Sequence, residues 1–117
     1  MYKWPKEFDF KVLVGSVVNS VTYTVNSISL VMNEDCVLTS EYRIVHTHEG
    51  VQEVVNVPAG KNGLCTIVGK RLTSCKLNND RTSLTLCLED GSWVTFDGDD
   101  ESYECYQLSF NGVDVVI

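Results

Sequence analysis

The same pattern of residues occurs twice along the chain, and this duplication limits the folds that the sequence can adopt. The stretch LVGSVVNSVTYTVNSISLVMNEDCVLTS (13–40) resembles IVGKRLTSCKLNNDRTSLTLCLEDGSWVTF (67–96), with Gly15 aligned to Gly69. Two extra residues enter the second copy in the turn NNDRT, after which Ile28 aligns with Leu84. A repeat of this kind indicates one structural unit used twice.

The ends of the two copies match more loosely. EYRIVHTHEGV resembles CYQLSFNGV, with Tyr42 over Tyr106, Ile44 over Leu108, and the pair Glu49-Gly50 over Asn111-Gly112. A chain of 117 residues is of the usual size for one domain. We therefore expect a single domain over residues 1–117, with internal repeats at about 13–56 and 67–117.

Apolar residues recur at every second position within each copy, as in Ile28, Leu30 and Met32 and again in Leu84, Leu86 and Leu88. Side chains of a β-strand alternate between its two faces, so this period predicts strands with one buried face. These runs are rich in β-branched residues and nearly free of proline, which favours the same interpretation.

The length of the turns decides which residues face the core. If Glu89-Asp90-Gly91 is a three-residue loop with Gly91 in the left-handed region, Leu86 lies opposite Val94 and Leu84 opposite Phe96. The loop 33–35 of the first copy fits the same rule, whereas a two-residue Asp-Gly turn would move Val94 and Phe96 to the other face. The three-residue loop leaves a second apolar face that must be covered or be a contact surface, formed by Val31, Val37, Cys87 and Trp93.

These patterns predict an all-β fold with two repeated β-meanders of about four strands each, packed as a sandwich or a partly closed barrel. The connecting stretch VPAGKNGLCTIVG (57–69) has a proline suited to a first helical position, but its glycines weaken a helix. We expect at most one short helix between the halves.

The charge balance narrows the classes of partner. The formal net charge is −7 and the sequence pI is about 4.6, which disfavours nucleic acid and anionic membranes and permits a basic protein. No stretch approaches the ~20 apolar residues of a membrane span, and the opening MYKWPKEFDF lacks the features of a signal peptide. The five cysteines show no paired spacing, which is typical of reduced thiols in a cytoplasmic protein.

Three stretches resemble a family of small bacterial proteins: DFKVLVGSVVNSV followed by ISLVMN, then LEDGSWVTFDGDDESYECYQL, and finally NGVDVVI. Members carry a similar F-L-V-G opening, a D-G-S hairpin and a Y-E-x-Y-Q-L type of ending, and here Cys36 and Cys105 stand where that pattern often has smaller residues. The resemblance implies a duplicated β fold in a bacterial cytoplasm and supplies no catalytic residues. Because small acidic proteins of this kind are often encoded beside secreted toxins, the resemblance implies a possible immunity role.

The acidic run DGDDE at 97–101 allows several functions. Calcium loops need a central glycine and a closing glutamate at fixed positions, which this run lacks. Adjacent carboxylates on an exposed turn are poor candidates for acid–base catalysis, because that chemistry needs two different environments. A polar connector and a docking surface for a cationic partner remain as alternatives, and a rim of charge would speed encounter with that partner.

His46 and His48 share a strand face and could chelate zinc with Glu49 or Glu53, although two exposed imidazoles on a hairpin fit the sequence better. Phosphate loops and nucleophile elbows are absent from the sequence, so we expect no enzyme, no cofactor and no metal site.

The main hypothesis is a toxin-neutralising immunity protein that binds and occludes a basic toxin domain, such as a nuclease. The alternative is a structural or self-associating β module, such as a homodimer, with no toxin partner. The expected partner-binding residues are Asp97, Asp99, Asp100, Glu101, Tyr103, Glu104 and Trp93.

Overall fold

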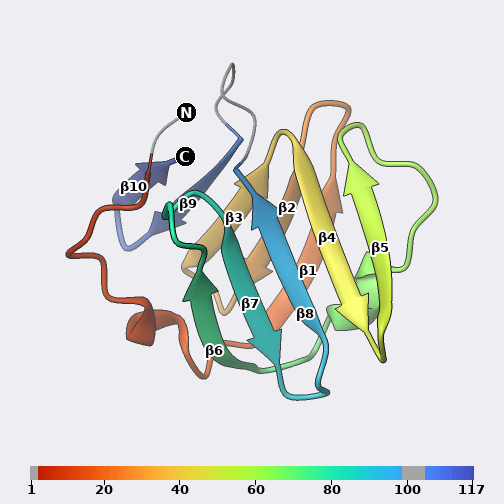
Figure 1. The fold of residues 1–117 in the computed structure, drawn as a ribbon, viewed down its shortest axis with the longest axis horizontal. Coiled ribbons are helices and arrows are strands. Elements are labelled where there is room, and N and C mark those ends of the chain that lie inside the picture. The colour runs from red at the N-terminus through yellow and green to blue at the C-terminus, as the bar shows by residue number, and fades with distance from the viewer. Residues whose placement is uncertain (1–2, 99–104) are drawn as a thin grey trace.

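The computed structural model describes residues 3–98 and 105–117, which form two five-stranded antiparallel sheets facing each other (Figure 1). Sheet 1 contains, in spatial order, β1 (Val18–Tyr23), β2 (Ile28–Met32), β3 (Cys36–Ser40), β9 (Tyr106–Phe110) and β10 (Val113–Val116). Sheet 2 contains β5 (Val51–Asn56), β4 (Arg43–His48), β8 (Trp93–Asp97), β7 (Leu84–Leu88) and β6 (Leu72–Leu77). The all-β prediction is confirmed, and the sheets form a sandwich rather than a closed barrel.

The two sheets each combine strands from both sequence copies. Strands β1, β2 and β3 of the first copy pair with β9 and β10 of the second, while β6, β7 and β8 pair with β4 and β5 (Figure 1). The last two strands of each copy therefore cross to the other sheet, and the two expected meanders do not form separate sheets. Reciprocal backbone hydrogen bonds join the copies where they enter their sheets, from Val18 N to Lys70 O at 2.9 Å and from Leu72 N to Ser16 O at 2.7 Å.

Two short 3-10 helices precede the sheets, η1 (Phe10–Leu13) before β1 and η2 (Leu64–Ile67) before β6. The helix η2 is the short element expected between the halves, and it begins six residues after Pro58 rather than at that proline. The helix η1 was not expected. Each helix places its last residue, Leu13 or Ile67, in the core with no exposed surface.

The strand register agrees with the three-residue loops. Met32 pairs with Cys36 and Leu30 with Leu38 in the first copy, and Leu86 pairs with Val94 in the second. Gly91 has a φ of 86°, in the left-handed region that a glycine adopts without a steric penalty. The predicted inner faces are therefore confirmed.

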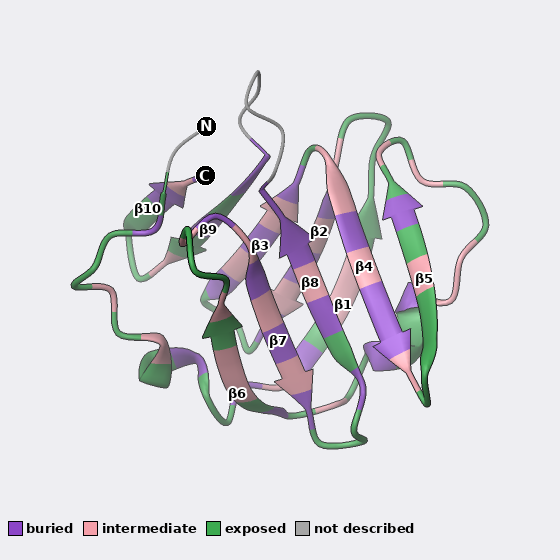
Figure 2. Ribbon diagram, viewed as in Figure 1, coloured by how far each residue is buried: buried purple, intermediate pink, exposed green. Residues whose placement is uncertain are grey.

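The core lies between the sheets and follows the period of two (Figure 2). Alternate residues along β2, β3, β7 and β8 are buried, and Phe96 and Tyr106 belong to the core. The phenol of Tyr106 accepts a hydrogen bond from Trp4 Nε1 at 2.6 Å and donates one to the Thr82 carbonyl oxygen at 2.9 Å. Both polar atoms of this buried pair are thus satisfied.

The predicted alignment between the ends of the two copies, EYRIVHTHEGV and CYQLSFNGV, was wrong by two residues within the strands. Ile44 lies opposite Phe96 in sheet 2, and Tyr106 lies opposite Ser40 in sheet 1, so Ile44 corresponds to Tyr106 rather than to Leu108. The turns that follow were matched correctly. Glu49 and Gly50 have φ values of 51° and 79°, and Asn111 and Gly112 have nearly the same values, 50° and 77°.

Candidate functional site

The acidic run begins at the end of β8. Asp97 is the last residue of that strand, and it is 8% exposed. The other acidic and aromatic residues expected to bind a partner in this segment lie outside the described residues: Asp99, Asp100, Glu101, Tyr103 and Glu104. The structure therefore describes only the residues at the two ends of this segment, Asp97 and Gly98 before it and Cys105 after it.

Asp97 forms an ion pair with Arg43, the residue opposite it on β4. The Arg43 guanidinium donates to Asp97 Oδ2 through both Nε, at 2.8 Å, and Nη2. The expectation that the acidic run lies on an exposed turn is wrong for this residue. Asp97 sits in a paired, mostly buried position, because its carboxylate neutralises an arginine that is 54 residues away in sequence.

The segment that contains the acidic run, which we call the acidic segment, joins β8 to β9, and the sandwich holds it at Gly98 and at Cys105. A Cβ atom on Gly98 would lie 2.0 Å from the Thr82 carbonyl oxygen, so the close approach of these two backbones requires glycine. The Gly98 amide donates to Ser83 Oγ at 3.1 Å. At the other end, the Cys105 amide donates to the Ile117 carbonyl oxygen at 2.6 Å, and the Cys105 carbonyl accepts from the Glu41 amide at 2.8 Å.

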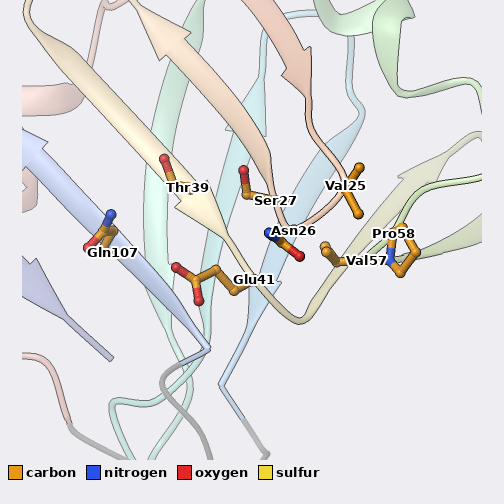
Figure 3. A pocket seen from close by; sticks show the side chains of 8 residues that line it. All are labelled: Val25, Asn26, Ser27, Thr39, Glu41, Val57, Pro58 and Gln107. Carbon is orange, nitrogen blue, oxygen red and sulfur yellow. The ribbon is translucent and has the colours of Figure 1, made fainter.

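A cleft of about 660 Å³ lies beside this second anchor (Figure 3). Its residues come from the β1–β2 turn, the end of β3, the segment after β5, and β9: Val25, Asn26, Ser27, Thr39, Glu41, Val57, Pro58 and Gln107. In Figure 3 the Glu41 carboxylate points toward Gln107, while Val57 and Pro58 lie on the other side of the cleft. The cleft thus combines one exposed carboxylate and several amide and hydroxyl groups with an apolar wall.

Trp93 begins β8 and lies on the outer face of sheet 2. Its side chain is 42% exposed, and its neighbours across the strands are Thr47 and Cys87. The next row of the same face contains Val45 and Thr95, followed by Val54 on the edge strand β5, which is 51% exposed. These uncharged side chains form what we call the Trp93 face.

The paired histidines differ from their expected position. His46 and His48 share the inner face of β4, with ring centroids 6.4 Å apart and an interplanar angle of 19°. His46 is only 8% exposed, so the expectation of two exposed imidazoles is wrong for it. Burial lowers the pKa of His46, the neighbouring His48 lowers it further, and Glu53 and Asp90 oppose these effects.

Within residues 3–98 and 105–117, no group of three or more histidine, cysteine, aspartate or glutamate side chains is placed to hold a metal ion. In the same part of the chain, no helix has the length and apolarity needed to cross a bilayer.

None of the five cysteines, all of which are described, forms a disulfide. Cys65 on η2 is exposed, whereas Cys36 is buried and Cys75 is partly buried. Burial raises the pKa of Cys36 and of Cys75 to about 12, so neither side chain is a thiolate at neutral pH.

Sequence reasoning missed Glu41 and its cleft. The signal was available in the duplication, because the two-residue insertion that aligns Ile28 with Leu84 also aligns Glu41 with Asp97. The correspondence is hard to see in the sequence, because Asp97 belongs to the charged run 97–101 whereas Glu41 is an isolated acid.

No protein-family model matches the chain, and no curated protein or solved structure matches it significantly.

Proposed function

We propose that this protein is a bacterial, cytoplasmic immunity protein that binds a basic toxin domain and occludes its active cleft, and that it acts by binding rather than by catalysis. The observation that carries the proposal is the Trp93 face, an uncharged surface with an exposed tryptophan on a chain with a net charge of −7. Tryptophan anchors at the centre and charge at the rim are characteristic of protein interfaces.

The spacing along β8 supports one continuous contact surface. Trp93 and Asp97 mark the two ends of this strand, and four steps of about 3.3 Å separate them by about 13 Å. A standard interface covers about 800 Å² per partner, or a disc of about 16 Å radius. Such an interface can include both Trp93 and the start of the acidic segment.

We propose that the gene immediately upstream encodes the toxin, and the product of that gene is used to test the proposal. The two chains should copurify and remain together in gel filtration, and the complex should lack the toxic activity. Trp93→Ala should raise the Kd by roughly thirtyfold, the effect of an interface anchor worth about 2 kcal/mol. The control is Val37→Ala, at the corresponding place on sheet 1, which should change the Kd less than about threefold. Failure of the parent protein to bind or neutralise the upstream product would refute the proposal.

The acidic segment is tested by charge removal that leaves Asp97 intact, because Asp97 is needed by Arg43. Changing Asp99, Asp100 and Glu101 together to Asn or Gln should slow association by roughly tenfold at low ionic strength. The difference should narrow as salt shortens the Debye length to ~10 Å at 0.1 M. Equal association rates for variant and parent at low salt would show that these residues do not steer the encounter.

A second candidate function is self-association without a toxin, and the same face favours it. Val54 and Trp93 are exposed on the outer face of sheet 2, and Val54 lies on β5, the edge strand of that sheet. Sedimentation over a hundredfold range of concentration should then show a dimer that Trp93→Ala converts to a monomer. A parent protein that stays monomeric throughout excludes this candidate.

A further inference from the structure

The duplication places two carboxylates at equivalent positions in the two sheets. Asp97 ends β8, and Glu41 directly follows β3, the strand that corresponds to β8. The pairing registers fix this equivalence, because Leu38 pairs with Leu30 as Val94 pairs with Leu86, and each carboxylate lies three positions further along the chain. The residue that faces the carboxylate also has an equivalent: Arg43 on β4 corresponds to Cys105, just before β9.

The two carboxylates differ in what surrounds them. Asp97 is 8% exposed and accepts hydrogen bonds from the Arg43 guanidinium. Glu41 is exposed, and no salt bridge to it is found within the described part of the chain. Its neighbour Cys105 cannot supply a positive charge, and contacts Glu41 through a backbone hydrogen bond of 2.8 Å. Sheet 2 therefore supplies its own arginine at this position, and sheet 1 does not.

The cleft beside Glu41 has the chemistry that a guanidinium requires. The five N–H donors of arginine form a planar fork, and a carboxylate with nearby amide oxygens can accept several of them. Glu41 supplies the carboxylate, while Gln107 and Asn26 supply amide groups (Figure 3). The apolar stem of an arginine can pack against Val57 and Pro58, as long basic side chains commonly do on apolar surfaces.

We propose that this cleft binds an arginine side chain of the partner protein, in the way that Asp97 binds Arg43 within the chain. The inference rests on the proposed function for the identity of the partner, but not for the chemistry of the site. Arginine is favoured over lysine, because an ammonium has three donors on a compact head and cannot form the two-pronged contact made in sheet 2. The volume of about 660 Å³ exceeds that of one side chain, so residues adjoining the arginine would enter as well.

The first test uses the isolated protein and small probes: N-acetyl-arginine amide, the corresponding lysine amide, and the neutral citrulline amide. Titration followed by NMR should give saturable shifts of the Gln107 and Asn26 side-chain amides, with the tightest binding for arginine. Glu41→Gln should weaken arginine binding by about five- to tenfold, as expected for loss of a charge-assisted hydrogen bond. The matched control is Glu34→Gln, an exposed acid on the β2–β3 turn that does not line the cleft, which should leave binding unchanged.

Three results would overturn the inference: shifts that do not saturate, equal binding of citrulline and arginine, or equal weakening by the two Gln substitutions. A second test separates this inference from the proposed function, by measuring the affinity of the upstream gene product for parent and Glu41→Gln protein. If the product binds both equally, the cleft is not its arginine site and the immunity proposal stands. If the product does not bind the parent while the arginine probe does, the immunity proposal fails and the cleft assignment stands.

Discussion

The two halves of the molecule share their strand register and several core residues, and they differ on the outer faces and at the strand ends. Leu30 and Leu86 occupy equivalent buried positions, and hydroxyl pairs lie at equivalent places outside them, Ser29 with Thr39 at 2.9 Å and Thr85 with Thr95 at 2.8 Å. Positions on the outer faces and at the strand ends have diverged. Trp93 stands where sheet 1 has Val37, and the Arg43–Asp97 pair of sheet 2 corresponds to Cys105 and Glu41.

This difference separates the demands of the fold from those of function. Several inner positions carry side chains of the same kind in both halves, as Leu30 and Leu86 do, because a repeated backbone leaves similar space to fill twice. Other inner positions differ, since Ile44 corresponds to Tyr106 and His46 to Leu108. The halves also differ on the outer faces and at the strand ends, where side chains do not fill the space between the sheets. A surface feature present in only one half is therefore a better candidate for binding than a feature present in both.

The largest expected effect tests the shared core. Leu30 and Leu86 each have no exposed surface and lie on strands that are flanked on both sides by other strands. Leu30→Ala and Leu86→Ala should each lower the free energy of unfolding by about 2–5 kcal/mol, since each removes buried methyl groups and leaves a cavity. Urea unfolding at neutral pH measures both. A loss below about 1 kcal/mol at both positions would contradict the placement of these two residues on the inner faces.

The next effect tests the diverged carboxylates. Asp97→Asn should lower the free energy of unfolding by about 1–3 kcal/mol, because it takes the counter-charge from Arg43, whose side chain is 32% exposed. Glu41→Gln, at the equivalent position, should change it by less than about 0.5 kcal/mol, because that carboxylate is exposed. Urea unfolding of the two variants beside the parent gives both values. Equal losses of unfolding free energy in the two variants would contradict the proposed difference between the paired carboxylate of Asp97 and the exposed carboxylate of Glu41.

The sequence predicted the local features of this fold and missed the contacts between distant segments. Period-two alternation identified the inner residues such as Leu86, because pleating alone determines which side chains share a face. The exchange of β4–β5 and β9–β10 between sheets was not predictable, because nothing local specifies which distant edge a hairpin joins. The burial of Asp97 was missed for the same reason, since its partner Arg43 is supplied by such an exchanged strand.

A smaller effect tests His46, whose equivalent in sheet 1 is Leu108. Burial holds the pKa of His46 below its ordinary value of 6.5, so the unfolded chain takes up a proton at higher pH than the folded protein does. Stability from this group is therefore present above pH 6.5 and is lost as the pH falls below that value. His46→Leu should make stability less dependent on pH just below 6.5. Urea unfolding of the parent and the variant at a series of pH values measures this, and parallel pH profiles would contradict it.

The smallest expected effect on stability concerns the two short helices. Cys65 of η2 occupies the position that Lys11 occupies in η1. Cys65 is exposed, whereas burial raises the pKa of Cys36 and of Cys75 to about 12 and keeps these two thiols protonated. A thiol reagent at pH 8 should therefore react with Cys65 first in the folded protein, since the thiolate is the nucleophile.

Cys65→Lys, which gives η2 the residue of η1, should remove this fast reaction and change the free energy of unfolding by less than about 0.5 kcal/mol. In denaturant without a reductant, the parent should show all five thiols and the variant one fewer. A fast reaction that persists in the variant would place the reactive thiol elsewhere. A count below five in the parent would reveal a disulfide, and with it an oxidising setting that the proposed cytoplasmic role does not allow.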